Sequence, residues 1–344
     1  MKKYDYVEVV KNIYNLFNNS FGTDYIIKYQ SRENIESLNP DIKVGKSAGG
    51  FYDAKSKSIY IFSNVINEIN QRNYNNSSNE NNNGLAFLIQ ACFHELEHRL
   101  QFDNRQKLRK QPAFSSVMYD IERLIMICDK DFYKQKHDSF YLEIDADTKG
   151  VDNAINFVDF YRIDGVNKEY YEAIRTYNQY RSLNYDIPQF VSRLNKIVKM
   201  YPNILNDERY INNQQILSFY DEKGNFKSIG EIMENQNILT PYIISSEMFL
   251  KGLDTKSITK EQRQFLIKNL SLVVTEHKSK KHLLKQMQPS TRIAIEKIDK
   301  YTHVSKTQSR RSAEFMFDED YYQFLESNLK SLSDVVIEND GQEL

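Results

Sequence analysis

Residues 85–101 read LAFLIQACFHELEHRLQ, and this stretch decides how the chain is interpreted. Its apolar residues recur at helical spacing and form one stripe: Leu85, Leu88, Ile89, Cys92, Leu96 and Leu100. His94 and His98 lie four residues apart, which in a helix separates them by about 40° around the axis and one turn along it. They share a face with Phe87 and Ala91, away from the stripe. We therefore expect the stripe to anchor the helix in a core and the two imidazoles to face a cleft.

Two imidazoles at this spacing can reach one metal ion, and zinc favours nitrogen ligands in a tetrahedral arrangement. Glu95 follows the first histidine and projects beside the metal, where it can take a proton from the bound water. A chance HExxH match is expected about once per hundred chains of this histidine content, so the alternative is an ordinary helix with two histidines. The central position of the motif in an amphipathic helix favours the metal site.

A catalytic zinc needs a third protein ligand. The other histidines do not follow at the short spacing that a third histidine ligand requires: His137, His277, His282 and His303. Residues 141–147 read YLEIDAD, and Glu143 and Asp147 share one helix face, while Leu142 and Ala146 can pack on a neighbouring helix. We expect Glu143 to bind the metal and Asp147 to accept a hydrogen bond from a ligand imidazole. The alternative is a pair of solvated acidic residues.

HELEH followed by a helical EIDAD resembles the gluzincin clan of zinc metallopeptidases, whose pattern is HExxH and then Glu-x-x-Ala/Ser-Asp. The matching residues are His94, Glu95, His98, Glu143, Ala146 and Asp147. The runs at 50–53 and 59–62 resemble the strand hairpin that precedes the active-site helix in small gluzincins, and are similar to the ImmA/IrrE-type peptidases. The resemblance covers roughly residues 45–150. It departs from the pattern in one respect, because the segment between His98 and Glu143 contains a complete extra helix.

The resemblance implies one Zn2+ per chain, held by His94, His98 and Glu143, with Glu95 as the general base that passes a proton to the leaving amine. It also implies that one strand of the sheet borders the cleft and pairs an extended peptide with its edge. Such a site usually adds a Tyr or His that stabilises the oxyanion. His137 and Tyr141 are the candidates close to Glu143 in sequence, against the alternative that they are ordinary core or surface residues.

The rest of the chain predicts an α+β fold that is predominantly helical. Strands are expected at 24–30 and at 49–53 and 58–62, the last two as a hairpin, and helices at 4–18, 85–101 and 115–131. A further helix is expected to begin near Asp138 and to run toward Phe160. Beyond residue 163 the pattern is helical throughout, with a capping box at residues 259–262 opening one helix.

We therefore expect a zincin-like N-terminal domain with a small sheet over residues 1–162, and a helical C-terminal domain over residues 163–344. The helical half carries no strong chemical motif. It is expected to close the cleft or to select the substrate, or else to be a separate interaction domain.

Composition limits the partners. The 46 Lys and Arg against 47 Asp and Glu leave a net charge of −1, so nothing indicates binding to nucleic acid or to an anionic membrane. No run approaches the roughly 18 apolar residues of a membrane span, and Met1-Lys2-Lys3 is followed by polar and aromatic residues instead of a signal-peptide core.

The two cysteines, Cys92 and Cys128, are interpreted as core residues in a reducing compartment. A disulfide between them is the alternative. The expected location is the cytoplasm, although unconventional export would leave no sign in the sequence.

The leading hypothesis is a zinc-dependent peptidase that hydrolyses a peptide bond in a protein or peptide substrate. The alternative is a regulatory metalloprotein that recognises one protein partner through its helical half, with slow or no turnover. A third hypothesis, a purely structural zinc, would leave Glu95 without a role, and three protein ligands leave one coordination position open.

Overall fold

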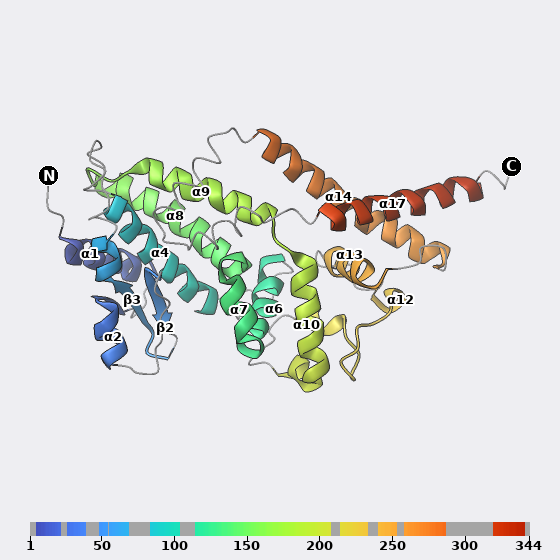
Figure 1. Cartoon of the computed structure of the whole chain (residues 1–344), viewed down its shortest axis with the longest axis horizontal. Coiled ribbons are helices and arrows are strands. Elements are labelled where there is room, and N and C mark those ends of the chain that lie inside the picture. The colour runs from blue at the N-terminus through green and yellow to red at the C-terminus, as the bar shows by residue number, and fades with distance from the viewer. Residues whose placement is uncertain are drawn as a thin grey trace. The chain divides into compact units, whose positions relative to one another are not determined.

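The chain is predominantly helical with one small sheet, as the sequence predicts (Figure 1). The computed structural model describes residues 5–21, 26–38, 48–53, 55–68, 83–103, 114–207, 214–232, 240–252, 258–286 and 319–340. These residues belong to two compact units, and the described apolar residues form two separate cores, one in each unit.

The first unit holds the described residues up to Asp103 together with Glu143–Arg181. The second holds the described residues in 104–142, 182–288 and 315–344. This division differs from the single boundary expected at residue 162. The chain leaves the first unit after Asp103 and returns to it at Glu143, so that one long helix contributes to both units.

The sheet of the first unit has three strands in the order β1-β3-β2. Strand β1 (Ile26–Gln30) runs parallel to β3 (Ser58–Phe62), and β2 (Gly50–Asp53) pairs with β3 antiparallel, which confirms the predicted hairpin. Every residue of β3 is buried. The central strand is therefore covered on both faces, and β2 is an edge strand of the described sheet.

Helices surround this sheet (Figure 1). Helix α1 (Tyr6–Phe21) packs on β1 and on α4 (Asn83–Asp103), and α4 packs on β2 and β3. Helix α2 (Arg32–Leu38) follows β1, and residues 63–68 form a short helix after β3. Helices α8 (Tyr141–Tyr161) and α9 (Lys168–Leu183) complete the unit.

The described secondary structure of the second unit is helical, apart from one isolated antiparallel bridge between Tyr220 and Phe226. Its helices are α6 (Phe114–Cys128), α7 (Lys130–Lys136), α10 (Ile187–Met200), α11 (Gln214–Ser218), α12 (Ile229–Ile232), α13 (Thr240–Lys251), α14 (Lys260–Gln286) and α17 (Glu319–Asp340). Short 3-10 helices span His137–Ser139 and Pro202–Asn206. Helix α10 packs on α6 and α13, and α14 lies beside α17 (Figure 1).

Local hydrogen bonds correct two predicted helix ends. The helix expected over 115–131 stops at Cys128, because the Asp129 carboxylate accepts from the Phe132 backbone N–H at 3.1 Å and caps a new helix. The helix expected from Asp138 begins at Tyr141, after a 3-10 turn. The capping box at Thr259 is confirmed, since Thr259 Oγ1 accepts from Gln262 N at 3.2 Å and Gln262 Oε1 accepts from Thr259 N at 3.0 Å.

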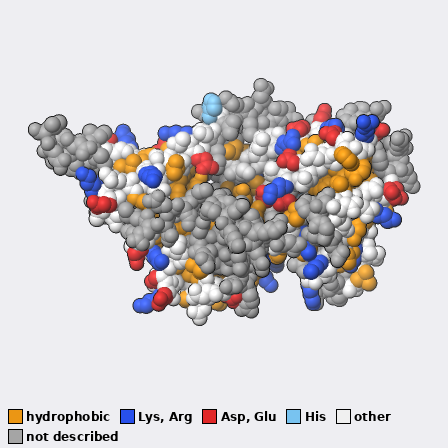
Figure 2. Space-filling view, turned by 180° about the vertical axis from the view of Figure 1, so that it is seen from behind, with side chains coloured by type: hydrophobic (Ala, Val, Ile, Leu, Met, Phe, Trp, Pro, Cys, Tyr) orange, Lys and Arg blue, Asp and Glu red, His pale blue; other side chains and the backbone are white. Residues whose placement is uncertain are grey.

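Both cysteines have free thiols, with Cys92 buried in the first unit and Cys128 half-buried in the second. None of the described helices combines the length and apolar character needed to span a membrane. On the face shown in Figure 2, the basic and acidic side chains of the described residues are interspersed.

Candidate metal centre

Helix α4 is buried on nearly every side, and its two histidines mark the exception. From Leu85 to Arg99 every side chain is buried except those of His94 and His98, which are 16% and 17% exposed. The helix is thus held by the core all round and opens only where the two imidazoles project. The predicted placement of the apolar stripe is confirmed, but Phe87 and Ala91 are buried as well.

Helix α8 approaches α4 closely at the first histidine. A Cβ added to Gly150 would lie 3.0 Å from the backbone N of His94 and 3.1 Å from its Cα. The missing side chain of Gly150 permits this approach, because a methyl group there would force the neighbouring backbone to shift by a few tenths of an ångström. One turn and two turns before Gly150, the same helix presents Asp147 and Glu143 to the imidazoles.

Three donor atoms converge between the two helices. His98 Nε2 lies 3.0 Å from His94 Nε2 and 3.2 Å from Glu143 Oε2, and His94 Nε2 lies 3.5 Å from Glu143 Oε2. Donors placed 2.0–2.1 Å from a tetrahedral zinc ion are about 3.3 Å apart, so all three distances fit one shared ion. Among the described residues these three side chains form the group that could hold a metal ion.

Asp147 lies behind the first histidine, where the sequence predicts it. Its Oδ1 is 2.8 Å from His94 Nδ1, on the side of the ring opposite the converging Nε2. The same Oδ1 accepts from Gln90 Nε2 at 3.1 Å, and Oδ2 accepts from the buried guanidinium of Arg181. Asp147 is thus held by two donors besides the imidazole, which fixes the ring that it contacts.

The charges of this cluster shift its pKa values. Burial alone lowers the pKa of His94, but the carboxylate of Asp147, followed by those of Glu143 and Glu95, raises it well above its ordinary value. For Asp147, burial raises the pKa, and His94 and Arg181 together lower it below its ordinary value. Without a metal ion the cluster therefore favours an ionised carboxylate facing a protonated imidazole.

The second histidine has a different partner. His98 Nδ1 lies 3.0 Å from Oε1 of Gln101, and Gln101 Nε2 donates to Asp145 Oδ2 at 3.1 Å. Burial lowers the pKa of His98, and the carboxylate of Glu143 outweighs it, so the net pKa is raised. One imidazole thus contacts a carboxylate through Nδ1 and the other an amide.

Glu95 lies toward the edge strand of the sheet. It is buried, and a Cβ added to Gly50 on β2 would lie 3.3 Å from its Cγ. Its charge contributes to the raised pKa of both imidazoles, after the larger effects of burial, Asp147 and Glu143. Glu95 therefore lies close to the start of β2, and its charge acts on both imidazoles.

The two candidates for oxyanion stabilisation belong to the second unit. His137 is exposed, lies 3.1 Å from the Asp138 carboxylate and contacts the Tyr133 ring. The Tyr141 ring contacts those of Tyr119 and Tyr185. These contacts do not test the assignment of His137 and Tyr141, which stays a prediction.

Several residues that hold the ligands from behind were not predicted from the sequence: Gln90, Gln101, Asp145, Lys149 and Arg181. Gln101 could have been found from its spacing, because it lies three residues after His98 on the same helix face. Arg181 gave no local signal, since it lies 34 residues from Asp147 in sequence.

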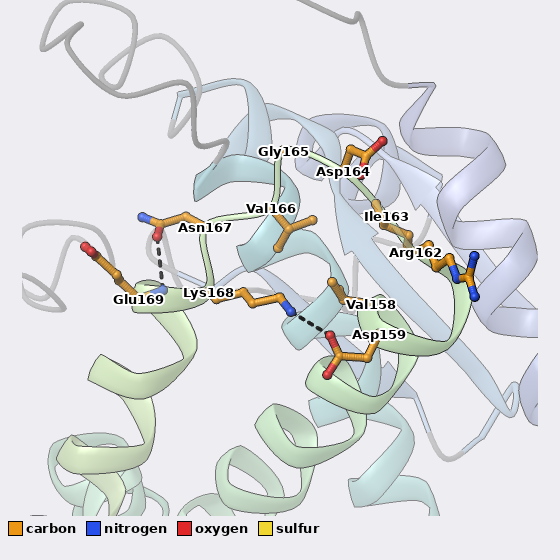
Figure 3. Close-up of a pocket in the computed structure, with 10 residues that line it drawn as sticks. All are labelled: Val158, Asp159, Arg162, Ile163, Asp164, Gly165, Val166, Asn167, Lys168 and Glu169. Atoms are coloured by element: carbon orange, nitrogen blue, oxygen red, sulfur yellow. Dashed lines mark hydrogen bonds and ion pairs between the residues drawn. The ribbon is translucent and has the colours of Figure 1, made fainter.

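A separate surface pocket lies at the turn between α8 and α9 (Figure 3). Its lining residues fall between Val158 and Glu169 and include none of the donor cluster. Its polar groups serve the turn itself, since Lys168 pairs with Asp159 at 2.6 Å and Asn167 caps α9 through Glu169 N. The pocket therefore adds nothing to the metal centre.

Comparison of the chain with models of known protein families, with curated proteins and with solved structures finds no match.

Proposed function

We propose that this chain is a zinc-dependent peptidase that cleaves a peptide bond in a protein or peptide substrate. The observation that supports this best is the convergence of His94 Nε2, His98 Nε2 and Glu143 Oε2 within 3.5 Å of one another. Glu95 follows the first of these residues in sequence and is buried beside them.

The donor set suits zinc. Two imidazole nitrogens and one carboxylate oxygen leave one tetrahedral position for water or substrate, which is typical of catalytic and not of structural zinc. A fourth protein ligand would support a purely structural ion, but the group found among the described residues has three members. A bound zinc ion would polarise the scissile carbonyl group and lower the pKa of the attacking water.

Glu95 is the proposed general base. Its carboxylate accepts a proton from the attacking water as the C–O bond forms, and then delivers that proton to the amine nitrogen as the C–N bond breaks. Two observations support this role: Glu95 is buried, and its charge acts on both imidazoles.

Strand β2 is the proposed docking edge for the substrate. It is an edge strand of the described sheet, and Gly50 at its start lies against Glu95. An extended peptide that pairs with this edge gains backbone hydrogen bonds and passes beside the general base. Such pairing gives affinity with little dependence on side chains, so selectivity would have to come from other parts of the chain.

The test compares the wild type with Glu95→Gln for zinc content and for cleavage of a proteome-derived peptide library. We expect one zinc per chain in both proteins and at least about a 100-fold slower cleavage by the variant, because a general base typically contributes that much. Glu172→Gln is the matched control, since Glu172 is exposed on α9 and pairs with Arg175 at 3.1 Å.

Undiminished cleavage by Glu95→Gln would remove Glu95 from the mechanism, and a wild type without zinc would refute the proposal. Stoichiometric zinc in a wild type that cleaves no library peptide would instead favour the regulatory metalloprotein that recognises one partner.

A further inference from the structure

The two histidines of the donor cluster contact different chemical groups through Nδ1. The group that contacts His98 belongs to a residue outside the HELEH and EIDAD motifs. His94 contacts the Asp147 carboxylate through Nδ1, whereas His98 contacts the side-chain amide of Gln101. A carboxylate can only accept a hydrogen bond, so it selects the imidazole tautomer that carries its proton on Nδ1. An amide offers both a donor and an acceptor, so it selects a tautomer only if its own orientation is fixed.

Three further residues fix that orientation. Gln101 Nε2 donates to Asp145 Oδ2 at 3.1 Å, and Lys149 Nζ lies 2.9 Å from the same oxygen. Lys149 also donates to Glu97 Oε1 at 2.8 Å. Gln101 and Glu97 are buried, and all of these residues lie on α4 and α8 within the first unit.

Each member of this chain of contacts allows only one polarity. An ammonium group only donates and an ionised carboxylate only accepts, so the amide nitrogen of Gln101 must face Asp145. Its oxygen then faces His98, which must carry its proton on Nδ1. Nε2 is then the nitrogen that remains for a metal ion, and it lies near His94 Nε2 and Glu143 Oε2, where the donor atoms converge.

We propose that Gln101, oriented by Asp145 and Lys149, is a positioning residue that sets the tautomer of His98 and so prepares its Nε2 for a metal ion. This inference rests on the metal centre of the proposed function. It also gives a role to two polar residues of the motifs that are not metal ligands, Glu97 in HELEH and Asp145 in EIDAD.

The experiment is a double-mutant cycle on the full chain. Asp145→Leu removes the acceptor that orients the amide, while Gln101→Glu replaces the amide by a carboxylate that needs no orientation. The tautomer of each histidine is read from the 15N NMR signals of metal-free protein labelled at histidine, at a pH above the raised pKa values of both imidazoles, where both rings are neutral. Zinc affinity is read separately by competition with a chelator.

We expect Asp145→Leu to raise the fraction of His98 that is protonated on Nε2 and to weaken zinc binding by about tenfold or more. His94 should keep its tautomer in the same sample, because Asp147 still faces its Nδ1. In the Gln101→Glu background, Asp145→Leu should change neither readout. Asp152→Leu is the matched control, since it also removes an aspartate–cation pair from α8, with Arg175 at 2.7 Å, and should leave both readouts at wild-type values.

An unchanged His98 tautomer in Asp145→Leu would overturn the proposal. The proposal would also be overturned if Asp145→Leu weakened zinc binding equally in the wild type and in the Gln101→Glu variant. A merely structural role of Asp145 predicts that result. Should Asp145→Leu fail to fold, Gln101→Leu compared with Gln101→Glu carries the same test, with loss of the tautomer preference expected only in the former. The tautomer is measured without metal, so a wild type that binds no zinc would refute the proposed function and leave this readout interpretable.

Discussion

Two buried glutamates, one in each unit, show how the surroundings of a carboxylate separate a structural role from a ligand role. Glu122 on α6 is fully buried and accepts from the backbone N–H groups of Tyr141 at 2.5 Å and Leu142 at 2.8 Å, and from the Tyr185 hydroxyl at 2.7 Å. Burial, followed by the Glu122 charge, raises the pKa of Tyr185 well above its ordinary value, so the phenol stays protonated and donates a hydrogen bond to Glu122. Glu122 thus accepts hydrogen bonds from these three donors and caps the first turn of α8.

Glu143, one residue after Leu142 on the same helix, has the opposite surroundings. Its Oε2 faces the Nε2 atoms of His94 and His98 at 3.5 and 3.2 Å, and the other nitrogen of each ring already contacts an acceptor. Three groups that present lone pairs to one point are stabilised by a shared cation. Burial alone therefore says little about a carboxylate, whereas the polarity of its neighbours distinguishes a helix cap from a metal ligand.

The largest expected effect is the loss of zinc affinity when the proposed ligand Glu143 is replaced. Glu143→Gln keeps the size of the side chain but replaces the anionic oxygens by an amide, which is a poor zinc ligand. Loss of residues that only orient a ligand costs about 10–100-fold in metal affinity, so loss of the ligand itself should exceed about 100-fold. Zinc content after dialysis and chelator competition measure it, with Glu122→Gln as the partner variant that should retain one zinc per chain. Full zinc affinity in Glu143→Gln would show that the third ligand is another residue.

The corresponding variant of the helix cap, Glu122→Gln, should lower the stability of the protein. Glu122→Gln turns an acceptor of three donors into an amide whose own N–H atoms face other donors. We expect the free energy of unfolding to fall by about 3 kcal/mol, because a buried charged acceptor and its partners lose their hydrogen bonds. Urea denaturation followed by circular dichroism measures this, and the exposed Glu172→Gln should stay within about 0.5 kcal/mol of the wild type. If Glu122→Gln proves as stable as the control, the cap is not what holds the start of α8.

The same contrast explains what could be predicted from the sequence. His94, His98, Glu143 and Asp147 follow helical periodicity within two short motifs, so their shared faces could be read from spacing alone. The hairpin of β2 and β3 was equally local. Whether the cluster binds zinc and cleaves peptides stays a prediction.

The missing parts depend on tertiary packing. Arg181 reaches Asp147 only because α9 folds back on α8, and Glu122 caps α8 from a helix that lies about 20 residues earlier in the chain. A boundary at residue 162 could not anticipate that the chain leaves the first unit after Asp103 and returns at Glu143. Neither event leaves a periodic or compositional sign in the sequence.

The smallest expected effect on stability and zinc affinity comes from Gly150 on α8, the helix that carries Glu143 and Asp147. Gly150→Ala places a methyl group 3.0 Å from the backbone N of His94, which forces α8 away from α4 at the metal centre. Overpacking costs about 1–3 kcal/mol, and the better helix propensity of alanine returns about 0.5–1 kcal/mol, so the net loss of stability should be near 1 kcal/mol. Zinc affinity should fall severalfold, because the distances between Glu143 Oε2 and the imidazoles lengthen.

Gly252→Ala separates spacing from stability in this experiment. Gly252 has a φ of 62°, and no heavy atom of the described residues lies within 4 Å of an added Cβ, so alanine there is strained by its backbone conformation. A left-handed alanine costs about 1–2 kcal/mol, which matches or exceeds the loss expected at Gly150. If both variants lose similar stability but only Gly150→Ala loses zinc affinity, the close approach of α8 to His94 sets the geometry of the donor cluster. Equal zinc affinity in the two variants would mean that the cluster tolerates the displacement, and that its geometry is held instead by the contacts behind the imidazoles.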